Sequence, residues 1–281
     1  MYYRFIPVVP LAVSGLLACG GGASTHPFSS VASTAGTGGG MAGTNSGAGG
    51  TLDALAVGVG GAGSGAGGMP FCGTELTGRV RDFKVSHPDF ESFLIGPDLG
   101  MVEKTLGGDK KPVYTGKPLT FTTSGKANFD QWYRDVPTIN LPIPLTLKLV
   151  DQGNGISGYD NQAFFPIDKQ GFGNEGNSHN FHFTFELHTS FVYKGFEIFQ
   201  FNGDDDLWVF VNNKLAIDLG GVHPSLEGKV DMLARSAELG LVVGNVYALD
   251  LFFAERHTSE SHFKVQTTIG SFTDCGTDVP Q

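Results

Sequence analysis

The sequence predicts an all-β fold: a two-sheet antiparallel β-sandwich of jelly-roll-like form behind a disordered tether rich in Gly, Ser and Ala. Three observations lead to this prediction. Many short segments alternate apolar and polar residues or are rich in aromatic and β-branched residues, as strands are. Gly and Pro separate these segments, and helical periodicity is scarce. The 23 phenylalanines supply the volume of a core.

The first clear strands are predicted at residues 145–149 and 181–188. Both segments alternate apolar and polar side chains, so we expect each to bury one face and expose the other to solvent. His182 and His188 share a parity in the second segment. We therefore place them, with the nearby His179, on its solvent-exposed face.

The next segment, residues 207–211, reads Leu-Trp-Val-Phe-Val and is apolar on both sides. Such a run indicates a central strand that is covered on both faces. Asn212 and Asn213 tolerate positive φ and predict a tight hairpin turn. The returning strand is expected at 214–219 and further strands at 247–254 and 263–269, while residues 231–239 fit either a short helix or a loop.

Three parts of the chain differ in composition. Residues 1–18 hold Arg4 and an apolar run too short to span a bilayer comfortably, which is typical of a signal peptide. The run ends in Leu-Leu-Ala-Cys-Gly and resembles a bacterial lipobox, so we expect lipid on Cys19; a plain secretory signal is the alternative. Residues 19–70 are the expected flexible linker, and residues 71–278 the folded domain.

The net charge of the chain limits the classes of partner that we expect. With 18 basic and 28 acidic residues the net charge is −10, which argues against nucleic acid and limits membrane contact to the N-terminal lipid. Gly20 follows the lipobox cysteine, where an aspartate would favour retention at the inner membrane. We therefore expect an exported protein anchored at the outer membrane or cell surface of a Gram-negative bacterium.

The two remaining cysteines, Cys72 and Cys275, fall at the two ends of the predicted domain. In an exported protein two such residues are expected to pair. The disulfide requires that both ends of the domain lie together, as they do in a sandwich whose first and last strands are neighbours.

Three consecutive aspartates, Asp204, Asp205 and Asp206, separate two predicted strands. Because adjacent carboxylates repel one another, a bound calcium ion with oxygen ligands is the simplest way to hold such a loop. In an extended loop the side chains alternate in direction, so one ion takes two of them. The alternatives are a solvated acidic turn, carboxylates that accept backbone N–H groups, and an ion pair with Arg256.

Other polar residues are predicted near this loop. Asp218 ends the returning strand, and Gly220-Gly221 after it allow close backbone approach or a sharp turn. A capping role is the alternative for Asp218. We take the candidate ligand-binding residues to be Trp132, Tyr133, Asp218, His223, Glu255 and His257. For Trp132 and Tyr133, as for Trp208, a place in the core is the alternative to stacking on a sugar.

Several long motifs resemble the fibro-slime domain: FNGDDDLWVFVNNKLAIDLGGVH from Phe201, GNVYALDLFFAERHTSESHF from Gly244, and HNFHFT from His179. With shorter upstream pieces the resemblance covers most of residues 76–272. The fibro-slime domain is in turn similar to the protective-antigen-type β-sandwich. That resemblance implies an extracellular module associated with carbohydrate binding, sometimes through calcium held by two adjacent aspartates, and implies no reaction. Here the pair is a triplet, and a second calcium loop has no recognisable counterpart.

The sequence thus predicts a surface-exposed, non-enzymatic module that binds polysaccharide or glycoprotein with the help of calcium. No nucleophile elbow or phosphate loop is present, and a run of three acids gives no way to keep one carboxyl neutral beside a charged one. The alternative is a structural surface or matrix protein that acts through protein–protein contacts.

Overall fold

The computed structural model describes residues 72–91, 95–116 and 122–275. The predicted signal peptide, the lipidated Cys19 and the linker lie outside the described residues. Neither described helix has the length and hydrophobicity that crossing a membrane requires. The elements are β1 (Glu75–Phe83), β2 (Gly96–Pro97), α1 (Lys126–Phe129), β3 (Asn140–Lys148), β4 (Val150–Gly153), β5 (Ile156–Asn161), β6 (Phe183–Val192), β7 (Ile198–Gly203), β8 (Asp206–Val211), β9 (Lys214–Leu219), β10 (Gly221–Val222), β11 (Leu226–Asp231), α2 (Ser236–Leu239), β12 (Val246–Glu255), β13 (Phe263–Thr267) and β14 (Phe272–Asp274).

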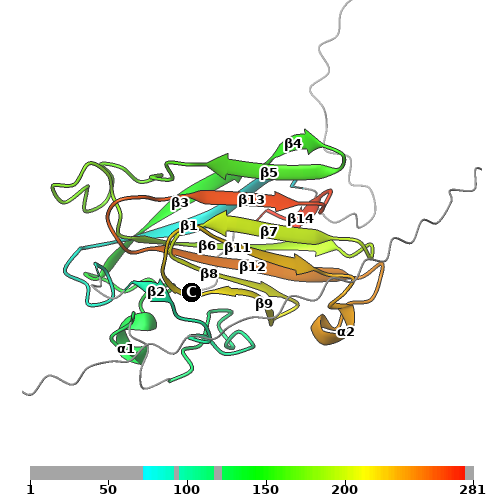
Figure 1. Ribbon diagram of the computed structural model, residues 1–281, viewed down its shortest axis with the longest axis horizontal. Coiled ribbons are helices and arrows are strands. Elements are labelled where there is room, and N and C mark those ends of the chain that lie inside the picture. The colour runs from blue at the N-terminus through cyan, green and yellow to red at the C-terminus, as the bar shows by residue number, and fades with distance from the viewer. Residues whose placement is uncertain (1–71, 92–94, 117–121, 276–281) are drawn as a thin grey trace, which may run out of the picture. The chain divides into compact units, whose positions relative to one another are not determined.

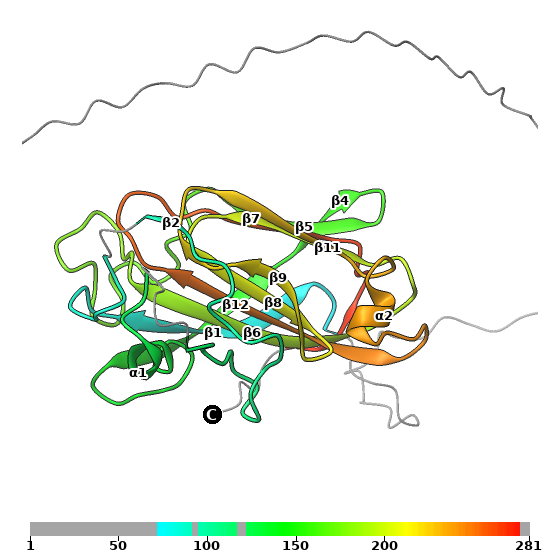
Figure 2. The same ribbon diagram turned by 60° about the horizontal axis from the view of Figure 1, so that its bottom comes forward.

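Two antiparallel sheets form the sandwich (Figures 1 and 2). The seven-stranded sheet has the order β3-β1-β6-β12-β8-β9, with β14 also paired to β6, and the five-stranded sheet has the order β11-β7-β13-β5-β4. The short strands β2 and β10 form a separate pair. The predicted all-β, two-sheet antiparallel sandwich is confirmed, and α2 shows that a short helix does form within residues 231–239.

The main core lies between the two sheets. It is rich in phenylalanine, and Phe263 alone contacts the rings of Phe164, Phe201 and Phe253 with centroids 4.6, 5.1 and 5.2 Å apart. Strands β7, β8, β12 and β13 contribute every second residue to this layer, as the period of two in a strand predicts. The predicted dependence of the core on phenylalanine is therefore confirmed.

A second core covers the other face of the seven-stranded sheet. The residues between β1 and β3, here called the covering segment, pack aromatic and aliphatic side chains against Trp208, Phe210 and Phe252. Figure 2 shows α1, which belongs to this segment, below the sheet. Strand β8 is therefore buried along its whole length, as predicted for residues 207–211.

The same cover corrects one prediction. Strand β6 was expected to expose one face, yet Thr184 and Glu186 are buried, and so are His182 and His188. Their polar side chains face the covering segment instead of solvent. Alternation marks the two faces of a strand, but it does not show whether the polar face meets water or a second layer.

Local sequence signals explain the hairpin and the edges. Asn212 and Asn213 have φ values of 50° and 65° and join β8 to β9, as predicted. At the outer edge of the seven-stranded sheet, β3 carries Pro142 and Pro144, which cannot donate hydrogen bonds to another strand.

The two ends of the domain meet, as the cysteines predicted. Cys72 and Cys275 form a disulfide across a sequence separation of 203. Gly73 pairs with Phe272 next to it, and both β1 and β14 pair with β6. The first and last strands are therefore neighbours on one partner strand.

Candidate functional site: an acidic loop beside a small pocket

The acidic loop connects β7 to β8 at one end of the sandwich. Gly203 ends β7 in a tight place, because a Cβ atom there would come within 2.3 Å of the backbone oxygen of His262. Asp205 has a φ of 54°, a left-handed conformation that aspartate tolerates better than most residues. This bend points successive carboxylates in different directions, so the three aspartates have different surroundings.

Asp206 begins β8 on the strand face that also carries Trp208 and Phe210 of the second core. One oxygen accepts the Nε–H of Arg256 at 2.6 Å, and the other accepts the amide of Gly221 at 2.6 Å. Both side chains of the ion pair are 0 % exposed. Asp206 is therefore corrected from a candidate metal ligand to a structural ion-pair residue, because protein donors hold both of its oxygens.

Arg256 is the centre of this buried network. Its Nη1 donates to the backbone oxygens of Asp89 and Thr122 at 3.0 and 2.6 Å, and its guanidinium lies 4.6 Å from the ring centroid of Trp132. The ion pair with Arg256 that sequence reasoning held as an alternative is thus present, but it occupies only Asp206.

Asp204 faces the loop between β12 and β13. One oxygen accepts the backbone amide of His262, and the other lies 3.1 Å from its Nδ1. Glu260 lies on the same loop, 4.0 Å from that nitrogen. Ligand atoms from Asp204, Glu260 and His262 all fall within 4.8 Å of one another. Sequence reasoning missed Glu260 and His262 as site residues, although both belong to the motif that carries the family resemblance.

Asp205 is a buried carboxyl that lines a small pocket. Its Oδ2 accepts the backbone N–H of Arg256 at 2.8 Å. Burial raises the pKa of Asp205 to about 8, against the opposing effect of the Arg256 charge. Glu255 is nearby and buried, and one of its carboxyl oxygens has no hydrogen-bond partner within the described structure. Burial, reinforced by Asp205, raises the pKa of Glu255 well above its usual value.

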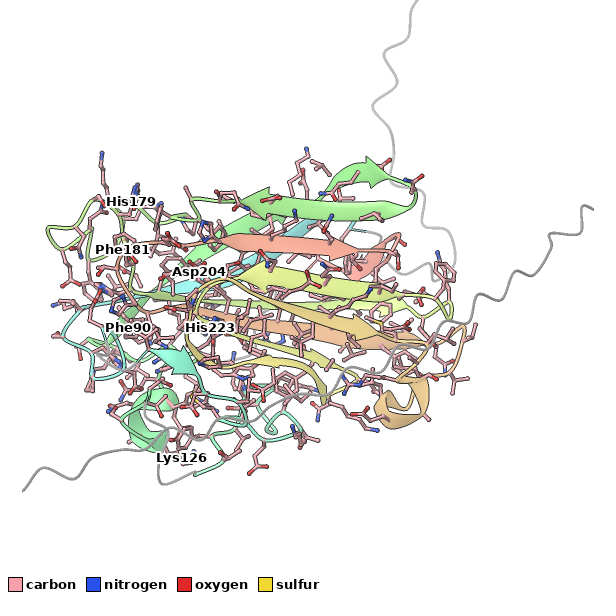
Figure 3. All side chains as sticks on the ribbon, in the orientation of Figure 1. Phe90, Lys126, His179, Phe181, Asp204 and His223 are labelled. Atoms are coloured by element: carbon pink, nitrogen blue, oxygen red, sulfur yellow. A yellow bond between two sulfur atoms is a disulfide. The ribbon has the colours of Figure 1, made fainter. Side chains whose placement is uncertain are left out.

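A pocket of about 140 Å³ opens beside Asp204 and Asp205. His223 and His257 also line it, so four of the predicted site residues meet there. Figure 3 shows Asp204 and His223 at the same end of the sandwich. The remaining lining residues, which the sequence did not single out, are Ile95, Val222, Pro224, Ser259 and Glu260.

The glycines after β9 place His223. Gly221 has a φ of 111°, and a Cβ atom there would come within 2.4 Å of the backbone oxygen of Gly96. The close backbone approach predicted for Gly220-Gly221 is therefore confirmed at Gly221. It allows β10 to pair with β2 and brings His223 to the pocket.

Asp218 does not line the pocket. Its carboxylate accepts the indole N–H of Trp208 at 3.0 Å and the amide of Gly100 at 2.9 Å. In the register of β8 and β9 it lies opposite Trp208, two residues beyond Asp206. Asp218 is corrected from a ligand-binding candidate to a residue that fastens the covering segment, which matches the capping alternative.

Trp132 and Tyr133 are also corrected. They are 0 % and 1 % exposed and belong to the second core, so a ligand in solvent cannot stack on either ring. The indole N–H of Trp132 donates to Asp89 at 3.0 Å. The alternative placement in the core is confirmed for both residues and for Trp208.

One known domain family matches part of this chain. Residues 151–276 match the PA14 domain. The match takes in less than half of the chain, but it contains the five-stranded sheet, the acidic loop and both histidines of the pocket. The expected similarity to the protective-antigen-type sandwich is confirmed over these residues, while the narrower resemblance to the fibro-slime domain stays a prediction. The covering segment lies outside the match.

Similar proteins include psiQ, psiD and psiE of Dictyostelium discoideum. The chain is 38% identical to psiQ over 70% of its own length and 21% of psiQ, and 38% identical to psiD over 70% of its own length and 41% of psiD. It is 49% identical to psiE over 45% of its own length and 27% of psiE. The chain thus spans less than half the length of each of these relatives.

Solved structures give weaker similarities. The PA14 domain of the antifreeze protein MpAFP has a TM-score of 0.29 at 6% identity, over 69% of this chain and 83% of that chain. A β-glucosidase from Kluyveromyces marxianus in complex with glucose has a TM-score of 0.23 at 18% identity, over 31% of this chain and 10% of that chain. With TM-scores of this size, the fold assignment rests on the strands themselves.

Proposed function

We propose that this chain is a non-enzymatic binding module that holds a polysaccharide or glycoprotein at the pocket beside Asp204 and Asp205. The observation that carries the proposal is the meeting of these two carboxylates with His223 and His257 in one pocket at the end of the sandwich. The PA14 match over the same residues supports it. Two adjacent aspartates fit the pattern of the related calcium-dependent sandwiches, once Asp206 is set apart by its ion pair.

The donor set fits calcium. Asp204, Asp205 and Glu260 offer carboxylate oxygens at or in the pocket, and calcium prefers oxygen ligands. A buried carboxyl such as Asp205 is costly to ionise unless a cation compensates its charge. A calcium ion held by these carboxylates would supply a Lewis-acidic point for sugar hydroxyls. His223 and Ser259 line the same pocket and would border a sugar bound there.

The predicted location completes the proposal. Lipid on Cys19 tethers the module to the outer membrane or cell surface, and the residues before Cys72 give it reach. The surface domain binds neighbouring matrix polysaccharide from that position, which makes adhesion its role.

A structural matrix protein is the second candidate, and the Arg256–Asp206 network is the observation that favours it. In this network both carboxylate oxygens of Asp206 accept hydrogen bonds from protein groups, one from Arg256 and one from the amide of Gly221. If Asp204 and Asp205 serve only to accept the amides of His262 and Arg256, the protein acts through protein–protein contacts instead.

Calcium titration of the full chain separates the two candidates. We expect calcium to raise Tm relative to a chelator, and Asp205→Asn to weaken calcium affinity at least tenfold. Asparagine keeps the shape of the side chain and tolerates the positive φ of this position, so the far-UV spectrum should stay β-like. Calorimetry measures the affinity, and a glycan array with calcium and with chelator measures sugar binding.

Asp151→Asn is the matched control, because Asp151 is exposed on the edge strand β4 and its side chain accepts only the amide of Gly153 in the described structure. It should bind calcium like the unmodified chain. An unchanged Tm with calcium removes the ion from the proposal, and an unchanged affinity in Asp205→Asn removes this loop as its site.

A further inference from the structure

The outer face of the five-stranded sheet carries a second pocket, of about 170 Å³, that the function proposed above does not use. It lies between two cross-strand rows of side chains. One row runs from Lys229 through Gln200 to Gln266, and the other contains Ile198, Thr268 and Ile156. Figure 1 shows the strands that carry these rows side by side.

One wall of this pocket is held in a fixed position. Gln152 on β4 reaches across Gly158, and a Cβ atom at Gly158 would come within 2.5 Å of the Gln152 side-chain nitrogen. The oxygen of Gln152 accepts the amide N–H of Gln266 at 2.6 Å. Glycine at position 158 therefore makes room for an amide pair that orients Gln266 before any ligand arrives.

The same row offers hydrogen-bonding groups that are not used. Within the part of the chain that the structure describes, no residue hydrogen-bonds to the side-chain amide of Gln200 or pairs with the ammonium of Lys229. An amide both donates and accepts, as a sugar hydroxyl does. Ile156 and Ile198 in the facing row add two aliphatic patches. A polar row that faces an apolar row matches the mixed surface of a sugar ring.

The charges around this pocket disfavour an anionic ligand. Lys229 is the one charged residue among the described lining residues, and Glu227 and Asp231 flank it on the same face of β11, two residues away on either side. Lys264 on the same face is neutralised by Asp160 at 2.8 Å. The surroundings therefore carry one negative charge in excess, while the described lining holds no carboxylate that would attract a cation. The pocket is also smaller than the roughly 300–1,000 Å³ of a typical drug-sized site, which limits it to one ring.

We propose that this pocket is a second sugar subsite, which binds one uncharged hexose unit of a polysaccharide without a metal ion. Gln200 and Gln266 hydrogen-bond its hydroxyls, Lys229 donates to a further hydroxyl, and Ile156 and Ile198 contact the ring. Two subsites on one domain let a single polysaccharide chain be held twice, which raises its apparent affinity.

The test is an array of soluble neutral oligosaccharides of glucose, mannose and galactose. It is probed with the full chain in the presence of a chelator, so that no calcium is available to the acidic loop. We expect at least one of these probes to bind in chelator, and Gln200→Leu to weaken that binding at least tenfold. Leucine keeps the bulk of the half-buried Gln200 side chain and removes its hydrogen-bonding groups, and an unchanged Tm confirms that the sheet is intact.

Gln170→Leu is the matched control, since Gln170 is an exposed glutamine outside this sheet and should leave binding unchanged. Asp205→Asn should also leave the binding in chelator unchanged, which separates this subsite from the calcium-dependent one. The proposal is overturned if none of the neutral probes binds in chelator, if Gln200→Leu binds as tightly as the unmodified chain, or if polygalacturonate binds this pocket more tightly than the neutral probes.

Discussion

Asp206 and Arg256 show how one residue of an acidic triplet becomes part of the core. Both side chains are completely buried, and their charges compensate each other across 2.6 Å. The same arginine also ties the covering segment to the sheet through the backbone oxygens of Asp89 and Thr122. Substituting a residue of this network therefore measures how much the acidic loop contributes to the free energy of unfolding.

We predict that Asp206→Asn lowers the free energy of unfolding by about 3–5 kcal/mol, because removing one partner leaves an uncompensated buried charge on Arg256. Urea denaturation followed by tryptophan fluorescence measures the loss. The control is Asp130→Asn, which breaks solvent-accessible ion pairs with Lys126 and Arg134 and should cost less than about 1 kcal/mol. Equal losses in the two variants would contradict the role given to Arg256.

At this scale the sequence could predict part of the site. The triplet itself marked Asp204 and Asp205, and the motifs around it marked His223 and His257, all of which line the pocket. It could not predict which aspartate turns inward, because that depends on the positive φ of Asp205 and on the distant Arg256. The sequence allowed Trp132 and Tyr133 either to stack on a sugar or to pack in the core, since the residues around an aromatic side chain in the sequence do not show what packs on it in the fold.

Strand β6 is the element on which the sequence prediction was least accurate. Its polar face carries Glu186, which pairs with Lys111 of the covering segment and Arg81 of β1, and His188, which contacts Glu186. His188 Nδ1 lies 2.7 Å from Asp250 on β12, and its Nε2 lies 2.6 Å from Glu186. The alternating polar residues of β6, which predicted a solvent-exposed face, instead form a buried network of charged groups between two layers.

This network makes stability depend on pH. Burial alone would lower the pKa of His188, but hydrogen bonds to Asp250 and Glu186 outweigh it and raise the pKa. The folded state then binds more protons than the unfolded state above the ordinary pKa of about 6.5. The contribution is complete below that pH and is lost as the pH rises through the raised pKa of His188.

We therefore predict that the difference in free energy of unfolding between the unmodified chain and His188→Gln shrinks as the pH rises from 6 towards 9. Urea denaturation at each pH, in chelator, measures it. Taking the difference removes effects that both proteins share, such as the falling contribution of Asp205 as the pH rises towards 8. A difference that stays constant or grows over this range would contradict the assignment of the proton to His188.

For the whole molecule, the fold class was accessible from the sequence because strand period, turn residues and phenylalanine content all agreed. Strands β8, β9, β12 and β13 were placed almost to the residue. The covering segment was not predicted as a layer, because its described residues form little regular structure beyond β2 and α1 and so give no periodicity to detect. The proximity of the two ends of the domain was predicted, since Cys72 and Cys275 lie at the domain boundaries and were expected to pair with each other.

The disulfide gives the last prediction, and it concerns the whole chain. Cys72 and Cys275 close a loop with a sequence separation of 203, so in the entropic model the bond destabilises the unfolded state by about 5 kcal/mol. Replacing both cysteines by serine should lower the free energy of unfolding by about 2–5 kcal/mol. The native fold should remain, because Gly73 still pairs with Phe272, and Thr77 still donates to the backbone oxygen at position 275. Urea denaturation of the double variant, with far-UV spectra to confirm β structure, measures both expectations. A loss below 0.5 kcal/mol, on the scale of ordinary surface substitutions, would mean that strand pairing alone holds the two ends together.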